Sequence, residues 1–119
     1  MSEPETTFSR LREVLAPYAL KLDARRDDDE ELYLDTRHRM NNGRVLFFGA
    51  VQRRKRYVAY HLMPVYTDAD LLDDVSDALE RRMQGKSCFN FTKVDAALFD
   101  ELAALTERGY RRYREHGYV

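Results

Sequence analysis

Val45–Tyr66 reads Val-Leu-Phe-Phe-Gly-Ala-Val-Gln-Arg-Arg-Lys-Arg-Tyr-Val-Ala-Tyr-His-Leu-Met-Pro-Val-Tyr. Two runs rich in aromatic and β-branched residues flank the polar and basic segment Gln52–Arg56, a pattern typical of a β-hairpin. Pro64 ends the second run because its backbone has no N–H group to donate. We therefore expect an antiparallel hairpin, Val45–Met63, at the centre of a sheet.

Both faces of this hairpin carry apolar side chains. Because side chains alternate along a strand, the first run is expected to have two faces. One face would hold Val45, Phe47, Gly49 and Val51, and the other Leu46, Phe48 and Ala50. In the second run Tyr57, Ala59, His61 and Met63 would oppose Val58, Tyr60 and Leu62. In a sheet with one solvated face, apolar and polar residues should alternate along each strand. The second face is therefore expected to be covered as well, or to form an apolar groove.

The sequence before the hairpin predicts a helix and two strands. Apolar residues at helical spacing indicate a helix over Glu5–Ala16, ended by a proline. From Tyr18 to Arg25 apolar and charged residues alternate, which favours a strand, with a kinked continuation of the helix as the alternative. A charged turn, Arg26–Glu31, leads to a short strand at Glu31–Asp35. Asn41-Asn42-Gly43 tolerates positive φ and predicts a tight turn.

The sequence after the hairpin predicts helical structure and one more strand. An apolar stripe from Leu71 to Met83 indicates a helix, which Ser76, a favourable N-cap, can interrupt. Gly85 stands at the expected C-terminus of that helix. Within the hairpin itself, Gly49 has large neighbours and indicates a bulge or a close backbone approach. A further strand is expected at Ser87–Thr92.

Asp95 is the expected N-cap of the last helix. Gly109 within this helix costs about 1 kcal/mol relative to Ala, so it indicates a close backbone contact or a bend. The element order becomes helix, four strands, one or two helices, strand and helix. It predicts an α+β fold in which one antiparallel sheet of about five strands packs with N-terminal, middle and C-terminal helices. We expect residues 1–119 to form a single domain.

Composition limits the partners of the chain. A net charge of -1 gives no general reason to expect nucleic acid as a partner. No apolar run approaches the roughly 18 residues that span a bilayer, and the acidic start lacks the features of a signal peptide. Cys88 is the sole cysteine, so no intramolecular disulfide can form. The cytoplasm is the expected compartment.

No motif of a known catalytic mechanism is present, so an enzyme is less well supported than a binding protein. The candidate ligand-binding residues are Tyr60, His61, Lys86 and Cys88. The His61 imidazole can act as ligand, acid or base, and a structural histidine with a satisfied hydrogen bond is the alternative. Lys86 can lower the pKa of the Cys88 thiol. Inert packing of the thiol is the alternative, because cysteine is commonly buried.

Clusters of like charge provide further candidates. A metal ion could be held by the carboxylates of Asp27, Asp28, Asp29, Glu30 and Glu31. A solvated charged turn is the alternative. Two basic segments, Arg53–Arg56 and Arg108–Arg114, could contact phosphate groups. The balanced overall charge favours a role in solubility for these segments instead.

Several strings resemble the YdhG-like family of bacterial proteins, a domain of unknown function. They are His61–Tyr66, Arg82–Phe91 (Arg-Met-Gln-Gly-Lys-Ser-Cys-Phe-Asn-Phe), Asp95–Phe99, Leu34–Thr36 and Leu46–Val51. The resemblance runs from about Leu32 to Tyr113 and implies a small α+β domain of the YdhG-like kind. One branch of the family is described as frataxin-like intracellular iron chaperones. Iron binding would then fall to Glu3, Glu5, Glu13, Asp23 and the Asp27–Glu31 segment.

Three functional hypotheses follow from the sequence. The first is a non-enzymatic binding domain that accepts a small molecule or a protein partner against the hairpin face of His61, near Lys86 and Cys88. The second is an iron-binding protein that uses the Asp27–Glu31 segment. The third is a homodimer that associates through the face of the sheet left open. No cofactor other than iron is expected.

Overall fold

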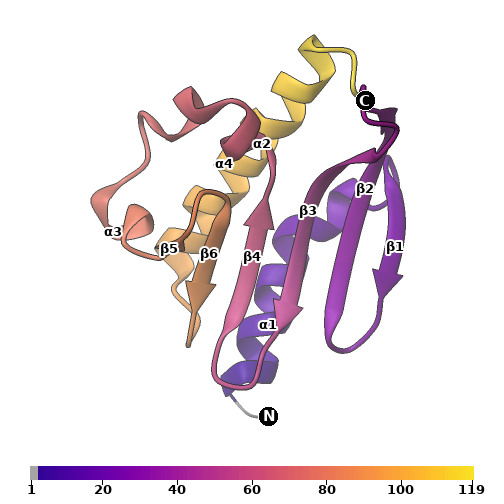
Figure 1. Cartoon of the computed structure of the whole chain (residues 1–119). Coiled ribbons are helices and arrows are strands. Elements are labelled where there is room, and N and C mark those ends of the chain that lie inside the picture. Colours follow the sequence, from indigo (N-terminus) through magenta and orange to yellow (C-terminus); the bar gives the residue numbers. More distant parts are fainter. Residues whose placement is uncertain (1–2) are drawn as a thin grey trace.

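The computed structural model describes residues 3–119. The strands are β1 Asp23–Asp27, β2 Glu31–Arg39, β3 Val45–Arg53, β4 Val58–Leu62, β5 Met83–Gln84 and β6 Cys88–Phe91. The helices are α1 Glu3–Leu15, α2 Pro64–Thr67, α3 Asp77–Glu80 and α4 Ala96–Glu115, with the 3-10 helices η1 Ala16–Tyr18 and η2 Ala69–Leu72. Within these residues six strands form one antiparallel sheet in the order β1-β2-β3-β4-β6-β5 (Figure 1). The predicted α+β fold with a single antiparallel sheet is confirmed.

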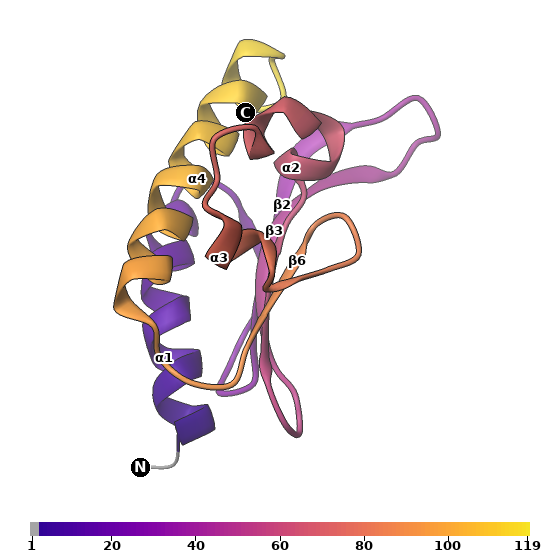
Figure 2. The same ribbon diagram turned by 90° about the vertical axis from the view of Figure 1, so that its left-hand side faces the viewer.

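Helices α1 and α4 pack side by side against the same face of the sheet, as the edge-on view of Figure 2 shows. The apolar stripe of each helix turns toward the strands, where its leucines are fully buried. The largest of the fully buried side chains are Tyr60, Tyr113, Phe48, Phe89, Phe91, Leu11, Leu15, Leu32, Leu34, Leu62, Leu79 and Leu102. Burial of one such side chain contributes about 1.5–3 kcal/mol, so this layer supplies most of the stabilising free energy.

A bulge in β3 changes which side chains face the helices. Leu34 pairs with Gly49, but the next residue of β2, Asp35, pairs with Phe47, which leaves Phe48 as an extra residue. The predicted alternation is therefore wrong for the first strand, because Phe47 lies on one face while Gly49 lies on the other. For β4 the predicted faces are confirmed by the burial of Val58, Tyr60 and Leu62 against the helices.

Gly49 marks a close backbone approach, as predicted. A Cβ atom there would lie 3.0 Å from the carbonyl oxygen of His61 and 3.3 Å from Leu15 Cδ1. The turn between the two central strands is shorter than the expected Gln52–Arg56, because the Arg54 N–H donates to the Tyr57 carbonyl at 2.9 Å. The strands consequently extend to Arg53 on one side and begin at Val58 on the other.

The strand predicted over Tyr18–Arg25 is wrong in its first half. Pro17 sits at the start of η1, where its fixed φ and missing N–H are tolerated. Tyr18 and Leu22, four residues apart, are buried, whereas Leu20 between them is 94% exposed. This spacing follows a helical turn and agrees with the alternative expectation of a kinked continuation of the helix. The strand β1 begins only at Asp23 and forms a hairpin with β2, which runs on to Arg39.

Of the two alternatives for the Leu71–Met83 stripe, one helix or a helix interrupted at Ser76, the interruption is confirmed, since α3 begins after the N-cap Ser76. The segment contains the end of η2, then α3, and then the start of the two-residue strand β5. Asp68 and Asp70, which precede the stripe, form ion pairs with Arg112 of α4. Gly85 lies in the turn between β5 and β6 with φ of 77° and ends no helix.

Several local signals in the sequence are confirmed. Ser76 caps α3 by accepting the Leu79 N–H at 3.1 Å, and Asp95 caps α4 by accepting the Leu98 N–H at 3.2 Å. Gly43 adopts φ of 81° in the turn before β3. Gly109 passes Pro64 at close range, as its position in the helix indicated. Across residues 3–119 no helix combines the length and apolar character that crossing a bilayer requires.

Candidate functional site

Within residues 3–119 the face of the sheet opposite α1 and α4 carries no helix, and it is called the open face below (Figure 2). One cross-strand row traverses it, because Arg26 pairs with Tyr33, Tyr33 with Ala50, Ala50 with His61, His61 with Cys88, and Cys88 with Gln84. Around this row the open face is completed by Phe47, Gln52, Ala59 and Asn90. Half-buried aromatic, imidazole, amide and thiol groups thus lie on a surface that the fold leaves uncovered.

The structure brings His61 and Cys88 together as direct cross-strand partners. The next pair along the two strands is Leu62 and Ser87. It is a hydrogen-bonded pair, because the Leu62 N–H donates to the Ser87 carbonyl at 2.9 Å. His61 and Cys88 are then a non-hydrogen-bonded pair, the kind in which side chains stand closest. The Cys88 thiol donates to Asn90 Oδ1 at 3.3 Å and not to the imidazole.

The His61 ring has an aromatic neighbour. Its centroid is 6.4 Å from that of Phe47 in an edge-on arrangement, and Phe47 stacks on Tyr33 at 4.6 Å. Within residues 3–119 no protein group forms a hydrogen bond with the imidazole of His61.

Burial keeps both groups of the pair neutral at pH 7. It lowers the pKa of His61, an effect that nearby Arg54 reinforces and Glu31 opposes. It raises the pKa of the Cys88 thiol, with Arg54 acting in the opposite direction. A neutral thiol that lacks a hydrogen-bonded base is a poor nucleophile. The arrangement therefore suits recognition better than covalent catalysis.

Tyr60 does not join this pair. It lies on the helical face and is fully buried, with its hydroxyl 2.6 Å from Thr106 Oγ1. The Thr106 hydroxyl donates to the Leu102 carbonyl at 2.7 Å, so the Tyr60 hydroxyl is the donor of the first bond. Tyr60 thus connects α4 to the sheet. Because its side chain is fully buried, the prediction of Tyr60 as a ligand-binding residue has no support.

Lys86 also stands apart from His61. It lies in the β5–β6 turn, and its ammonium group is 5.9 Å from the centroid of the Tyr66 ring. Both residues line an apolar groove next to α2. The predicted influence of Lys86 on the Cys88 thiol has no support, since Arg54 is the cation that affects that pKa.

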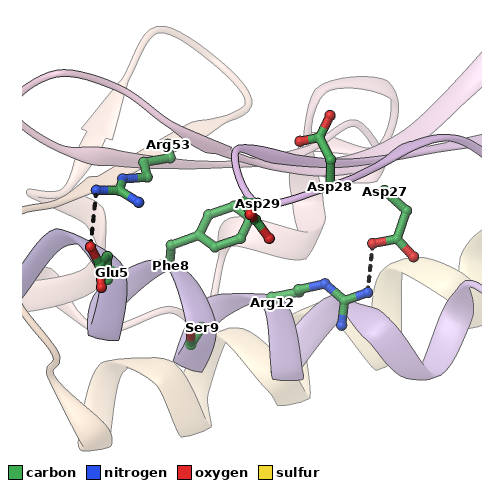
Figure 3. A pocket seen from close by; sticks show the side chains of 8 residues that line it. All are labelled: Glu5, Phe8, Ser9, Arg12, Asp27, Asp28, Asp29 and Arg53. Carbon is green, nitrogen blue, oxygen red and sulfur yellow. Dashed lines mark hydrogen bonds and ion pairs between the residues drawn. The ribbon is translucent and has the colours of Figure 1, made fainter. Parts of the chain in front are cut away.

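The acidic segment lies beside a groove of about 610 Å³ between α1 and the β1–β2 turn, shown in Figure 3. Arg12 donates to Asp27 at 2.6 Å, and Arg53 lies 3.8 Å from Glu5. The carboxylates of Asp27, Asp28 and Asp29 point in different directions (Figure 3). Arginines of α1 and β3 thus interleave with the acidic groups.

The remaining carboxylates of this segment stabilise the turn. Asp28 accepts hydrogen bonds from Arg26 at 2.6 Å and from the N–H groups of Glu30 and Glu31. The Arg26 bond is the main reason why the pKa of Asp28 is lowered. Glu31 is held by Arg26 at 3.0 Å and Gln52 at 2.7 Å. In the described part of the chain no three His, Cys, Asp or Glu side chains form a group able to hold a metal ion. The metal-binding hypothesis gains no geometric support.

The two basic segments are partly engaged by intramolecular partners. Arg54 donates to Gln52 at 2.9 Å, and Arg111 lies 3.9 Å from Glu107. Arg112 makes two hydrogen bonds to the carboxylate of Asp70, at 2.9 and 3.0 Å. These contacts favour a structural role over phosphate binding.

Sequence reasoning missed Tyr33, Phe47 and Asn90 as residues of the open face. For Tyr33 a signal existed, since it alternates with the buried Leu32 and Leu34. Phe47 was hidden by the bulge, because strict alternation would have grouped it with Gly49. Asn90 could be placed only once β6 was paired with β4.

Comparisons of the chain with protein-family models, with curated proteins and with solved structures found no match.

Proposed function

We propose that this protein is a non-enzymatic binding module whose open face receives a protein partner, and that this partner is a second copy of the chain. The proposal is carried by one observation. Both long helices occupy the same face of the sheet, while the opposite face presents Tyr33, Phe47, His61 and Cys88 without a covering layer (Figure 2). Aromatic side chains of this kind are enriched in protein interfaces.

The dimensions of the face suit a weak symmetric dimer. The two longest strands, β2 and β3, have nine residues each. At about 3.3 Å per residue and about 4.8 Å between strands, a sheet of this size offers at most roughly 700 Å². A standard interface buries about 800 Å² per partner, and smaller ones are transient. We therefore expect a two-fold, face-to-face dimer with micromolar affinity.

The charges of the open face allow the open faces of two copies to stack on each other. Arg25 lies 3.3 Å from Asp35, and Arg26 lies 3.0 Å from Glu31, so the charges near β1 are paired within each copy. The centre of the face is neutral at pH 7 because of the pKa shifts of His61 and Cys88. Arg54 is the exception, because its guanidinium donates to the neutral amide of Gln52 and acts on the pKa of both His61 and Cys88. A face-to-face dimer has to leave this guanidinium in water, since burying an unpaired charge would oppose association.

Sedimentation equilibrium across the micromolar range tests the proposal. The wild-type protein should show a concentration-dependent dimer at about pH 7.5 and dissociate as the pH falls through the lowered pKa of His61, where the imidazole becomes charged. Phe47→Glu should be monomeric throughout. Leu20→Glu is the matched control, because it places the same charge at a side chain 94% exposed in the turn before β1. His61→Gln should dimerise without the dependence on pH.

Two outcomes would contradict this function. A wild-type mass that stays monomeric at the highest concentration would exclude the dimer. Equal association of wild type and Phe47→Glu would place the interface elsewhere. Membership of the YdhG-like family remains a proposal based on the strings quoted above, and iron handling is less well supported because arginines bind several of the carboxylates concerned.

A further inference from the structure

An apolar groove lies between the α2–η2 segment and the β5–β6 turn, which are neighbours in both ribbon views (Figures 1 and 2). Its volume is about 800 Å³. The side chains that matter for its chemistry are Val65, Tyr66, Ala69, Leu72, Met83 and Lys86. Concave, mainly apolar surfaces with few polar groups are the usual form of small-molecule sites.

Contacts with α4 hold one wall of the groove in place. Arg112 binds both carboxylate oxygens of Asp70, at 2.9 and 3.0 Å. His116 Nε2 lies 2.8 Å from Asp68 Oδ1. Pro64 packs directly on the backbone of Gly109. The wall is thus formed before any ligand arrives, which reduces the entropy lost on binding.

The opposite wall comes from the β5–β6 hairpin. Met83 pairs with Phe89, whose side chain is fully buried and anchors this short hairpin to the core. Gly85 adopts φ of 77° in the turn and allows the chain to reverse. Lys86 follows at the rim, with its ammonium group 5.9 Å from the centroid of the Tyr66 ring.

The charge distribution indicates what the groove accepts. Lys86 is the one charged side chain among the lining residues that the structure describes. It is exposed, and in residues 3–119 no carboxylate forms an ion pair with it. A ligand that complements this groove has an apolar body and a single anionic end.

We propose that this groove binds a single alkyl chain that ends in a carboxylate. The chain lies against Tyr66, Leu72 and the adaptable side chain of Met83, and the carboxylate meets Lys86. This site is separate from the open face, so the inference goes beyond the proposed dimer and does not depend on it.

Titration of the full chain with decanoate, below its micelle concentration, is the direct test. Calorimetry should show saturable, sub-millimolar binding, and amide NMR shifts should concentrate at Tyr66, Ala69 and Met83. Decanol and decylammonium should bind at least tenfold more weakly, because neither offers an anion to Lys86. Acetate, which lacks the chain, should not bind measurably.

Variants assign the two parts of the ligand. Lys86→Gln should weaken decanoate about tenfold, the size expected for loss of one charge-assisted contact. Lys93→Gln is the matched control, because Lys93 is an exposed lysine in the loop between β6 and α4. Ala69→Trp should fill the groove and abolish binding, and circular dichroism verifies that the variant is folded.

The proposal is overturned by any of four results. Decanoate and decylammonium could bind with equal affinity, or Lys86→Gln could leave binding unchanged. The NMR shifts could centre on Phe47 and His61 instead of the groove. A hydrophobic tripeptide with a free carboxylate that bound more tightly than decanoate would replace the alkyl chain by a peptide terminus as the occupant.

Discussion

Gly109→Ala tests the packing of α4 most directly, through the sign of the change in the free energy of unfolding. A Cβ atom at this position would lie 2.9 Å from Pro64 Cβ and 3.1 Å from Pro64 Cγ. Carbon atoms pack best at about 3.5–4.0 Å, so the helix and α2 would have to separate by about half an ångström or more. The proline ring cannot rotate away as a flexible side chain would.

Two opposing free energies decide the result. Alanine in place of glycine inside a helix stabilises by about 1 kcal/mol. Overpacking in a well-packed region costs about 1–3 kcal/mol. We expect the clash to win and the free energy of unfolding to fall by about 1 kcal/mol, which corresponds to a decrease in Tm of roughly 4 °C for a chain of this length.

Urea unfolding followed by circular dichroism measures this change. Ala104→Gly, at an exposed position of the same helix, reports helix propensity alone and should cost about 1 kcal/mol. Combining Gly109→Ala with Pro64→Gly should remove the clash, so that alanine becomes stabilising in that background. A gain of about 1 kcal/mol for Gly109→Ala in the wild-type protein would refute the predicted close packing.

Three further predictions follow from buried or paired groups. Tyr60→Phe leaves the Thr106 hydroxyl without its donor and should cost about 1–2 kcal/mol in urea unfolding, whereas an unchanged midpoint would contradict the 2.6 Å bond. Burial raises the pKa of Asp68, but hydrogen bonds, led by that from His116, outweigh it and lower the pKa below 3.8. The stability that this carboxylate contributes is thus present above pH 3.8 and lost as the pH falls through the lower, folded-state pKa. In Asp68→Asn the free energy of unfolding should accordingly fall less steeply with decreasing pH than in the wild type. An equally steep decrease in both proteins would exclude this role. Because burial raises the thiol pKa, Cys88 should react with iodoacetamide at neutral pH more slowly in the folded protein than in urea. Mass spectrometry follows the alkylation, and equal rates in the two states would contradict the raised pKa.

Much of the candidate site lay beyond prediction because it depends on strand pairing. His61 and Cys88 were both singled out in the sequence, yet 26 positions separate them and only the β4·β6 register makes them neighbours. The same sequence reasoning grouped Tyr60 with them, although alternation along β4 places it on the helical face. Lys86 was recognised, but its relation to Tyr66 required the turn at Gly85 and the position of α2.

Signals that act over a few residues were read correctly from the sequence. The caps at Ser76 and Asp95 involve an N–H group three residues away, and Gly43 adopts the positive φ that its turn requires. The helical stripe of α4 reports burial on one side of that helix. Each of these features depends on the chain within one or two turns of the residue concerned, so composition and spacing suffice to predict it.

Features that involve distant segments were settled only when the chain folded. Phe48 is an extra residue only because of the way in which β3 pairs with β2. This bulge places Phe47 on the face opposite Gly49. Arg112 of α4 binds both carboxylate oxygens of Asp70, which lies 42 positions earlier in the sequence. Which face of the sheet stays open follows from where α1 and α4 pack (Figure 2). Hydrogen-bond register, ion pairs and burial between remote residues are properties of the assembled structure, because no local pattern specifies the partner.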